Sequence, residues 1–121
     1  KKILACGLTN YAHPLGLAAT NSVIDSIQTK EFKTKFAQLE SKLIDSKNKL
    51  TSLAIVKDIR QVGLLMAIDL EKKPDFHLFT EKEILIAIVG NRLVLAPPYI
   101  ISPTKLSTLL SRIYKILKEM N

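Results

Sequence analysis

The chain is poor in the residues that build disulfides and metal centres. Its 121 residues include one cysteine, Cys6, and two histidines, His13 and His77. A lone cysteine cannot form an internal disulfide, which favours a reducing compartment, and we therefore expect a cytoplasmic protein. Neither histidine has a second type of ligand nearby at the spacing of a zinc site, so no metal site is predicted.

Long hydrophobic runs are also missing. The longest, residues 84–90, is far shorter than the roughly 20 residues of a membrane-spanning helix, so no membrane segment is expected. The apolar stretch at the N-terminus is too brief for a secretory signal. Because the first residue is not methionine, we expect the chain to be a piece cut from a longer protein.

Aromatic residues make up only 6% of a chain whose formal net charge is +7. A nucleic-acid-binding surface usually combines a basic stripe with aromatic rings for stacking. Between residues 30 and 49 the lysines instead alternate with Glu31, Glu40 and Asp45, as on a solvated helix face. We therefore expect no nucleic-acid partner and keep that possibility only as a minor alternative.

What the sequence does contain is a strong helical periodicity. Hydrophobic residues make up 47% of the chain, enough for one domain over residues 1–121 with a core of its own. Apolar residues recur at three- and four-residue spacing, which predicts long helices over 14–29 and 31–53 and a C-terminal helix over 103–120. Pro14 suits the first turn of the first helix, and Ser102-Pro103 provides a cap and a first-turn proline for the last.

Between these helices the pattern becomes typical of strands. Residues 59–70 predict one strand with a bend or close approach at Gly63. Gly90-Asn91 separates two short apolar runs and predicts a hairpin of strands 84–89 and 92–96. The capping-box spacing of residues 80–83 predicts the start of a helical turn there. The fold class is therefore α+β, a small antiparallel sheet over 59–96 covered by helices.

Three segments, in this order, resemble the class III aminotransferases. Residues 7–16, GLTNYAHPLG, are similar to the family pattern G-x-T-x-x-G-[HN]-P-L-[AG]. Residues 58–70, DIRQVGLLMAIDL, are similar to D-V-R-G-x-G-L-M-x-G-I-E-L, and residues 91–102 resemble the family's strand, double proline and helix start. With the three blocks in register, the resemblance covers essentially all 121 residues, and the chain resembles the C-terminal small domain of a fold type I enzyme of this family.

The resemblance implies a binding role for Thr9. In this family the matching threonine binds the phosphate of pyridoxal phosphate held by the neighbouring subunit, so the parent enzyme is expected to be a homodimer. A short hydroxyl in a glycine-containing loop before a helix suits that contact. Gly7 would keep the loop free of side-chain obstruction. Arg60 is implied to be structural, and His13 to set the helix start.

The resemblance also implies that no catalytic residue lies in this chain. The lysine that forms the Schiff base with pyridoxal phosphate precedes the Thr9 segment and is not reached, so the fragment is expected to be inactive without the rest of the parent chain. The parent activity would be transfer of an amino group from an amino acid or ω-amine to a 2-oxo acid. The alternative is a non-catalytic α+β binding or scaffolding domain.

Two departures from the family pattern concern the hairpin. Many members carry an arginine on the strand before the double proline, where it grips a substrate carboxylate; the matching position here is Val94, and the hairpin offers only Arg92. If Val94 faces the site, a bidentate clamp is absent there, and the parent would favour an ω-amine or a donor recognised elsewhere. In addition, residues 71–83 are shorter than the family norm and leave barely one helical turn before the hairpin.

Overall fold

The computed structural model describes residues 12–120, which fall into two compact units divided between residues 35 and 36. Each unit is described by itself. In the first unit, helix α1 (Pro14–Gln28) begins with proline in its first turn, as predicted, and ends one residue earlier than expected. None of its residues is buried. Helix α2 (Lys30–Leu50) follows after Thr29, whose hydroxyl oxygen accepts a hydrogen bond from the Phe32 amide at 3.1 Å.

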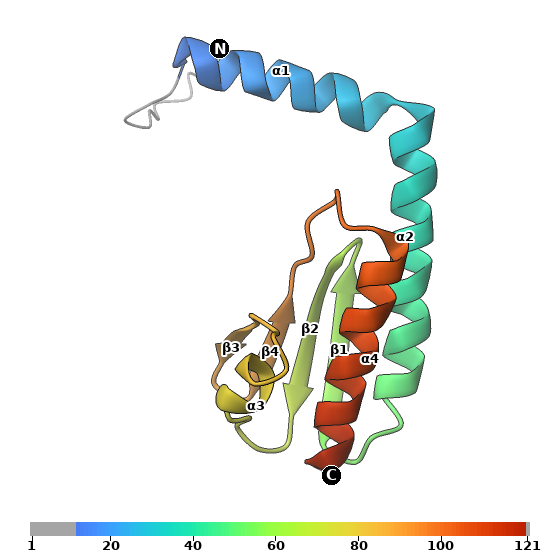
Figure 1. Cartoon of the computed structure of the whole chain (residues 1–121), viewed down its shortest axis with the longest axis vertical. Coiled ribbons are helices and arrows are strands. Elements are labelled where there is room, and N and C mark those ends of the chain that lie inside the picture. Colours follow the sequence, from blue (N-terminus) through green and yellow to red (C-terminus); the bar gives the residue numbers. More distant parts are fainter. Residues whose placement is uncertain (1–11, 121) are drawn as a thin grey trace, which may run out of the picture. The chain divides into compact units, whose positions relative to one another are not determined.

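The second unit is built on a four-stranded antiparallel sheet in the order β1-β2-β4-β3 (Figure 1). Its strands are β1 (Val56–Val62), β2 (Leu65–Leu70), β3 (Ala87–Val89) and β4 (Arg92–Leu95). The single strand predicted for residues 59–70 is wrong, since this segment is a hairpin that turns at Gly63 and Leu64. Gly63 has φ +56°, a left-handed conformation that glycine adopts without steric cost.

The hairpin at Gly90-Asn91 is confirmed, with Gly90 at φ +60°. Strand β3 is shorter than predicted and begins only at Ala87. A helical turn starting at residue 80 is also wrong, because α3 (His77–Thr80) ends there. Its start is fixed instead by Asp75, whose carboxylate accepts a hydrogen bond from the His77 amide at 3.0 Å.

Helices α2 and α4 (Pro103–Glu119) lie side by side against one face of this sheet (Figure 1). Ser102 caps α4 as predicted, accepting a hydrogen bond from the Lys105 amide at 3.2 Å. Helix α2 ends three residues before its predicted end at Leu53, but Leu53 remains buried. The core lies between these helices and the sheet, and its largest fully buried side chains are Leu39, Leu43, Leu50, Met66, Ile68, Phe79, Leu93, Leu106, Ile113 and Leu117.

The predicted α+β class, an antiparallel sheet covered by helices, is thus confirmed. Ile59, Ile68 and Leu93 stand opposite one another on three adjacent strands and point toward the helices. Because side chains alternate along a strand, their neighbours Arg60, Asp69 and Arg92 lie on the other face. In residues 36–120 that face is exposed at Val62, Leu65 and Val89.

The two left-handed glycines provide a matched test of this architecture. Alanine at either position adopts a left-handed conformation at a cost of roughly 1–2 kcal/mol. A Cβ at Gly63 would also lie 3.2 Å from Cζ of Phe36, whose ring packs against Tyr99, whereas a Cβ at Gly90 meets nothing within 4 Å. We expect Gly63→Ala to lower the free energy of unfolding in urea more than Gly90→Ala. In a chain that also carries Phe36→Leu, the difference between the two losses of unfolding free energy should be smaller. Equal losses for Gly63→Ala and Gly90→Ala in the wild-type chain would contradict this account.

Candidate functional site

The two residues predicted to contact a cofactor, Thr9 and Gly7, lie outside the described residues. The structure begins to describe this region at the start of α1. His13 occupies the N-cap position, makes no side-chain capping hydrogen bond, and accepts one at its carbonyl from the Leu17 amide at 2.9 Å. His13 and Pro14 thus stand at the helix start, as the sequence predicted.

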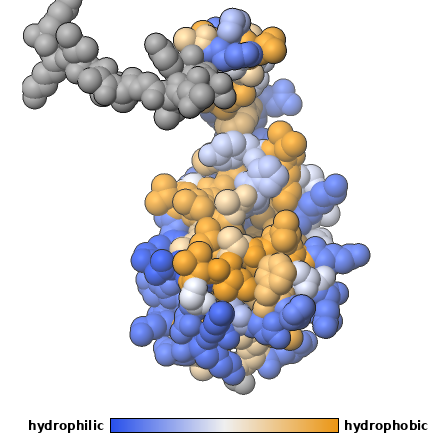
Figure 2. Space-filling view, turned by 90° about the vertical axis from the view of Figure 1, so that its left-hand side faces the viewer, coloured by the Kyte–Doolittle hydropathy of each residue, from blue (hydrophilic) through white to orange (hydrophobic). Residues whose placement is uncertain are grey.

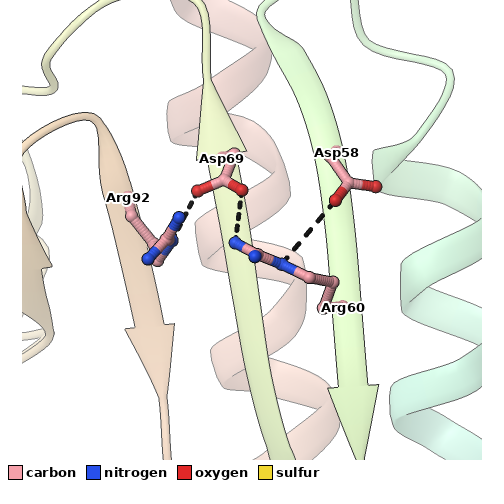
Figure 3. Close-up of polar contacts among 4 residues, drawn as sticks. All are labelled: Asp58, Arg60, Asp69 and Arg92. Carbon is pink, nitrogen blue, oxygen red and sulfur yellow. Dashed lines mark hydrogen bonds and ion pairs between the residues drawn. The ribbon is translucent and has the colours of Figure 1, made fainter.

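A charged network crosses the exposed face of the sheet in the second unit (Figure 3). Asp69 on β2 is at its centre. One of its carboxylate oxygens accepts a hydrogen bond from Nε of Arg92 on β4 at 2.5 Å, and the other accepts one from the guanidinium of Arg60 on β1. Asp58 lies 3.7 Å from Nε of Arg60. The network therefore joins three adjacent strands.

The two guanidinium groups hold Asp69 in its charged form. The hydrogen bond from Arg92 lowers the pKa of the Asp69 carboxyl, against the opposing effect of desolvation, and the positive charges of Arg60, Arg92 and Lys57 lower it further. The same hydrogen bond raises the pKa of Arg92. Asp69 and Arg92 therefore stabilise each other's charged forms.

Val94 lies on the same face as this network. It stands opposite Ala67 on β2 and Ala87 on β3, and its neighbours Leu93 and Leu95 are buried on the helix side. A carboxylate clamp needs a free guanidinium. The same row continues to Arg60 on β1, opposite Ala67, but this guanidinium is paired with Asp69 and Asp58. Arg92 lies one row away and is already bound to Asp69.

Other kinds of reactive site are not found in the described part of the chain. Residues 12–120 contain no buried polar or charged residue, so every lysine among them is at least partly exposed to solvent. They contain no group of histidine, cysteine or acidic residues that could hold a metal ion. No helix among them is long and apolar enough to cross a membrane.

Comparison with known protein families shows to which family this chain belongs. The family model described as aminotransferase class-III matches residues 2–117. The chain belongs to the class III aminotransferase family. Among characterised members, it is 26% identical over 124 residues to an omega-aminotransferase of Caulobacter vibrioides. It is also 26% identical over 117 residues to the adenosylmethionine-8-amino-7-oxononanoate aminotransferase of Buchnera aphidicola.

These alignments cover 95% and 93% of this aminotransferase chain but only 28% and 27% of the two relatives. Solved structures show the same relation. A thermostable omega transaminase mutant from Pseudomonas jessenii superposes with a TM-score of 0.78 at 18% identity, covering 98% of this chain and 30% of its own. Acetylornithine aminotransferase from Elizabethkingia anophelis superposes with a TM-score of 0.74 at 24% identity, covering 98% of this chain and 32% of its own. The fold is therefore that of a segment of these enzymes.

The Asp69 network is the feature of this aminotransferase segment that sequence reasoning missed. The single strand predicted over residues 59–70 would place Arg60 and Asp69 far apart along it. The hairpin at Gly63 folds the segment back and makes them neighbours. The signal that could have revealed the pairing is Gly63 itself, had it been interpreted as a turn between two strands.

The lowered pKa of Asp69 predicts a stability that depends on pH. A carboxyl whose pKa is lower in the folded than in the unfolded state adds stability above its unfolded pKa of about 3.9, and this is lost as the pH falls toward the folded value. Asp69→Asn should therefore flatten the dependence of the urea midpoint on pH below about 4. Asp45→Asn, which removes no ion pair within residues 12–120, is the control. Equal profiles for the wild type and Asp69→Asn would refute the coupling.

Proposed function

We propose that this chain is the C-terminal part of a pyridoxal-phosphate-dependent transaminase. The parent enzyme transfers an amino group from an amino acid or ω-amine to a 2-oxo acid. The observation that carries the proposal is the family match over residues 2–117 in a chain that spans only 28% of an omega-aminotransferase. The remaining part of the reaction machinery would come from the rest of the parent chain.

Exposed apolar surface supports a missing partner segment. In α1, Leu15, Leu17 and Val23 are all more than half exposed, and none of the helix is buried. In the second unit Leu85 and Ile100 are 90% and 85% exposed, and Figure 2 shows apolar side chains gathered on one side of this unit. Soluble monomers rarely expose large contiguous apolar patches. We infer that the rest of the parent chain covers these surfaces.

The cofactor of the parent would be pyridoxal phosphate, which acts as an electron sink for carbanion chemistry when bound. The described part of this chain does not fit the covalent role, because a Schiff-base lysine needs a desolvated site and every lysine in residues 12–120 reaches solvent. What this chain would contribute is the phosphate contact of Thr9 in a loop kept open by Gly7. No step of the reaction is assigned to a side chain of the described part.

The exposed face of the sheet supports a proposal about the amino donor of the parent. Val94, Ala67 and Ala87 are uncharged, and the guanidinium groups of Arg60, at the end of their row, and of Arg92, in the next row, are both paired with Asp69. A substrate α-carboxylate would find no free bidentate partner in this row. We therefore propose that the parent favours an ω-amine, or a donor whose carboxylate is recognised by another part of the enzyme.

The parent is also proposed to be a cytoplasmic homodimer. If Thr9 contacts the phosphate held by a second identical subunit, each active site is built from two chains. Thr9 would then lie at a subunit boundary, and two complete chains would be necessary for either site.

Replacing Thr9 in the parent tests its role. Thr9→Ala removes one hydroxyl donor to a charged phosphate, which costs about 1.5–3 kcal/mol, or roughly 10- to 150-fold in cofactor affinity. Spectroscopic titration of the apoenzyme with pyridoxal phosphate measures this change. Thr9→Ser, which keeps the hydroxyl, is the matched control.

Subunit exchange tests whether the contact acts between chains. A variant lacking the Schiff-base lysine and a variant lacking the Thr9 hydroxyl should partly restore activity when mixed, because one site of the heterodimer is then intact. Unchanged cofactor affinity in Thr9→Ala, or no recovery after confirmed exchange, would rule out the role across the boundary.

The chain alone should be inactive toward amino donors and should form no stoichiometric covalent adduct with pyridoxal phosphate. Its described lysines all reach solvent, so none lies in the desolvated site that activates a nucleophilic lysine. Incubation with the cofactor, borohydride reduction and intact mass measurement provide the check. A single modified lysine at full occupancy would contradict the prediction, and the sequence preceding residue 1 in the parent should contain the missing lysine.

A further inference from the structure

A shallow groove of about 670 Å³ runs between α2 and α4. Helix α2 lines it with Lys42 and Lys49, and α4 lines it with Lys115 and Lys118. Positive side chains from two separate helices thus border one depression. A volume of this size lies within the range of roughly 300–1,000 Å³ found for small-molecule sites.

The positive charges of the groove are not neutralised by the protein. The only acidic residue in its lining is Asp45, so four ammonium groups against one carboxylate leave three positive charges. None of the four lysines forms an ion pair within residues 12–120. This contrasts with Arg60, Arg92 and Arg112, each of which lies within 4 Å of a carboxylate.

Hydroxyl groups accompany the lysines. Ser52 and Ser107 donate their hydroxyl hydrogens to backbone carbonyls of their own segments. Ser46, Ser111 and Tyr114 also line the groove, and their hydroxyls make no hydrogen bond within the described residues. These three groups retain a hydrogen that an anionic oxygen could accept.

Helix dipoles explain only part of this arrangement. The partial negative charge at a helix C-terminus favours cations in the last turn. Lys49 occupies the last turn of α2, and Lys118 that of α4. Lys42 and Lys115 lie earlier in their helices, beyond the reach of this effect, and yet face the same groove.

We infer that this groove binds a small anion carrying two or more linked phosphate groups. Lysine binds phosphate as a point charge, and cations on both sides of a groove match negative charges spread along a chain of phosphates. A nucleic acid strand fits less well because the groove contains a single aromatic ring, the half-buried Tyr114, where strand binding usually uses several stacking rings. The inference is independent of the transaminase function.

Inorganic tripolyphosphate is the probe, titrated by calorimetry into the 121-residue chain at low ionic strength. The groove variant Lys42→Gln/Lys49→Gln/Lys118→Gln should bind about tenfold more weakly, since each exposed charge pair is worth about 0.5 kcal/mol. Lys115 is left intact because it also borders a second depression beside Glu81. The control Lys47→Gln/Lys57→Gln/Lys105→Gln removes the same charge outside the groove lining and should stay within about twofold of the wild type.

A substitution of opposite sign keeps the test decisive if the triple variant unfolds, as judged by circular dichroism. Asp45→Asn removes the groove's only carboxylate and should strengthen binding about twofold, whereas Glu40→Gln on α2 should not. No binding of tripolyphosphate would overturn the inference. So would equal losses in the two triple variants, or a single-stranded oligonucleotide bound more tightly through the same lysines.

Discussion

The register of the β1–β2 hairpin is the constraint on which the second unit depends. Pairing Ile59 with Ile68, and Ile68 with Leu93, directs three branched side chains toward α2 and α4. A slip of one residue would turn this row to the opposite face and bring Arg60 and Asp69 into the core. The free-energy cost of burying these charged side chains would then destabilise the folded state. Gly63 fixes the register because its left-handed backbone lets the chain reverse after Val62.

The elements marked by strong local signals could be predicted from the sequence. Ser102-Pro103 located the start of α4, and Gly90-Asn91 located the second hairpin, because caps and turns of this kind act over a few residues. The first hairpin was missed because its turn contains Leu64, an apolar residue that continues the pattern of a strand. Leu64 is in fact buried, so its apolar side chain reflects its place in the core and gives no information about the turn of the backbone.

The candidate site was less predictable for a physical reason. The bond between Asp69 and Arg92 joins residues that are distant in the sequence, and it exists only because β2 pairs with β4 in one register. No local pattern encodes such a pairing. The sequence alone did not determine on which face of the sheet Val94 lies. The burial of its neighbours Leu93 and Leu95 shows that Val94 lies on the exposed face. The contact predicted for Thr9 lies outside the described residues and stays a prediction.

The two edges of the sheet have a consequence for how the isolated segment behaves in solution. An unpaired edge strand is a template for association with other chains. One edge here is β3, only three residues long, which offers few free backbone groups. The other edge, β1, is longer but has an irregular register between Val56 and Asp58 and carries the exposed side chains of Lys57, Asp58 and Arg60. Shortness at one edge, and charge with a distorted ladder at the other, both disfavour growth of the sheet into fibrils.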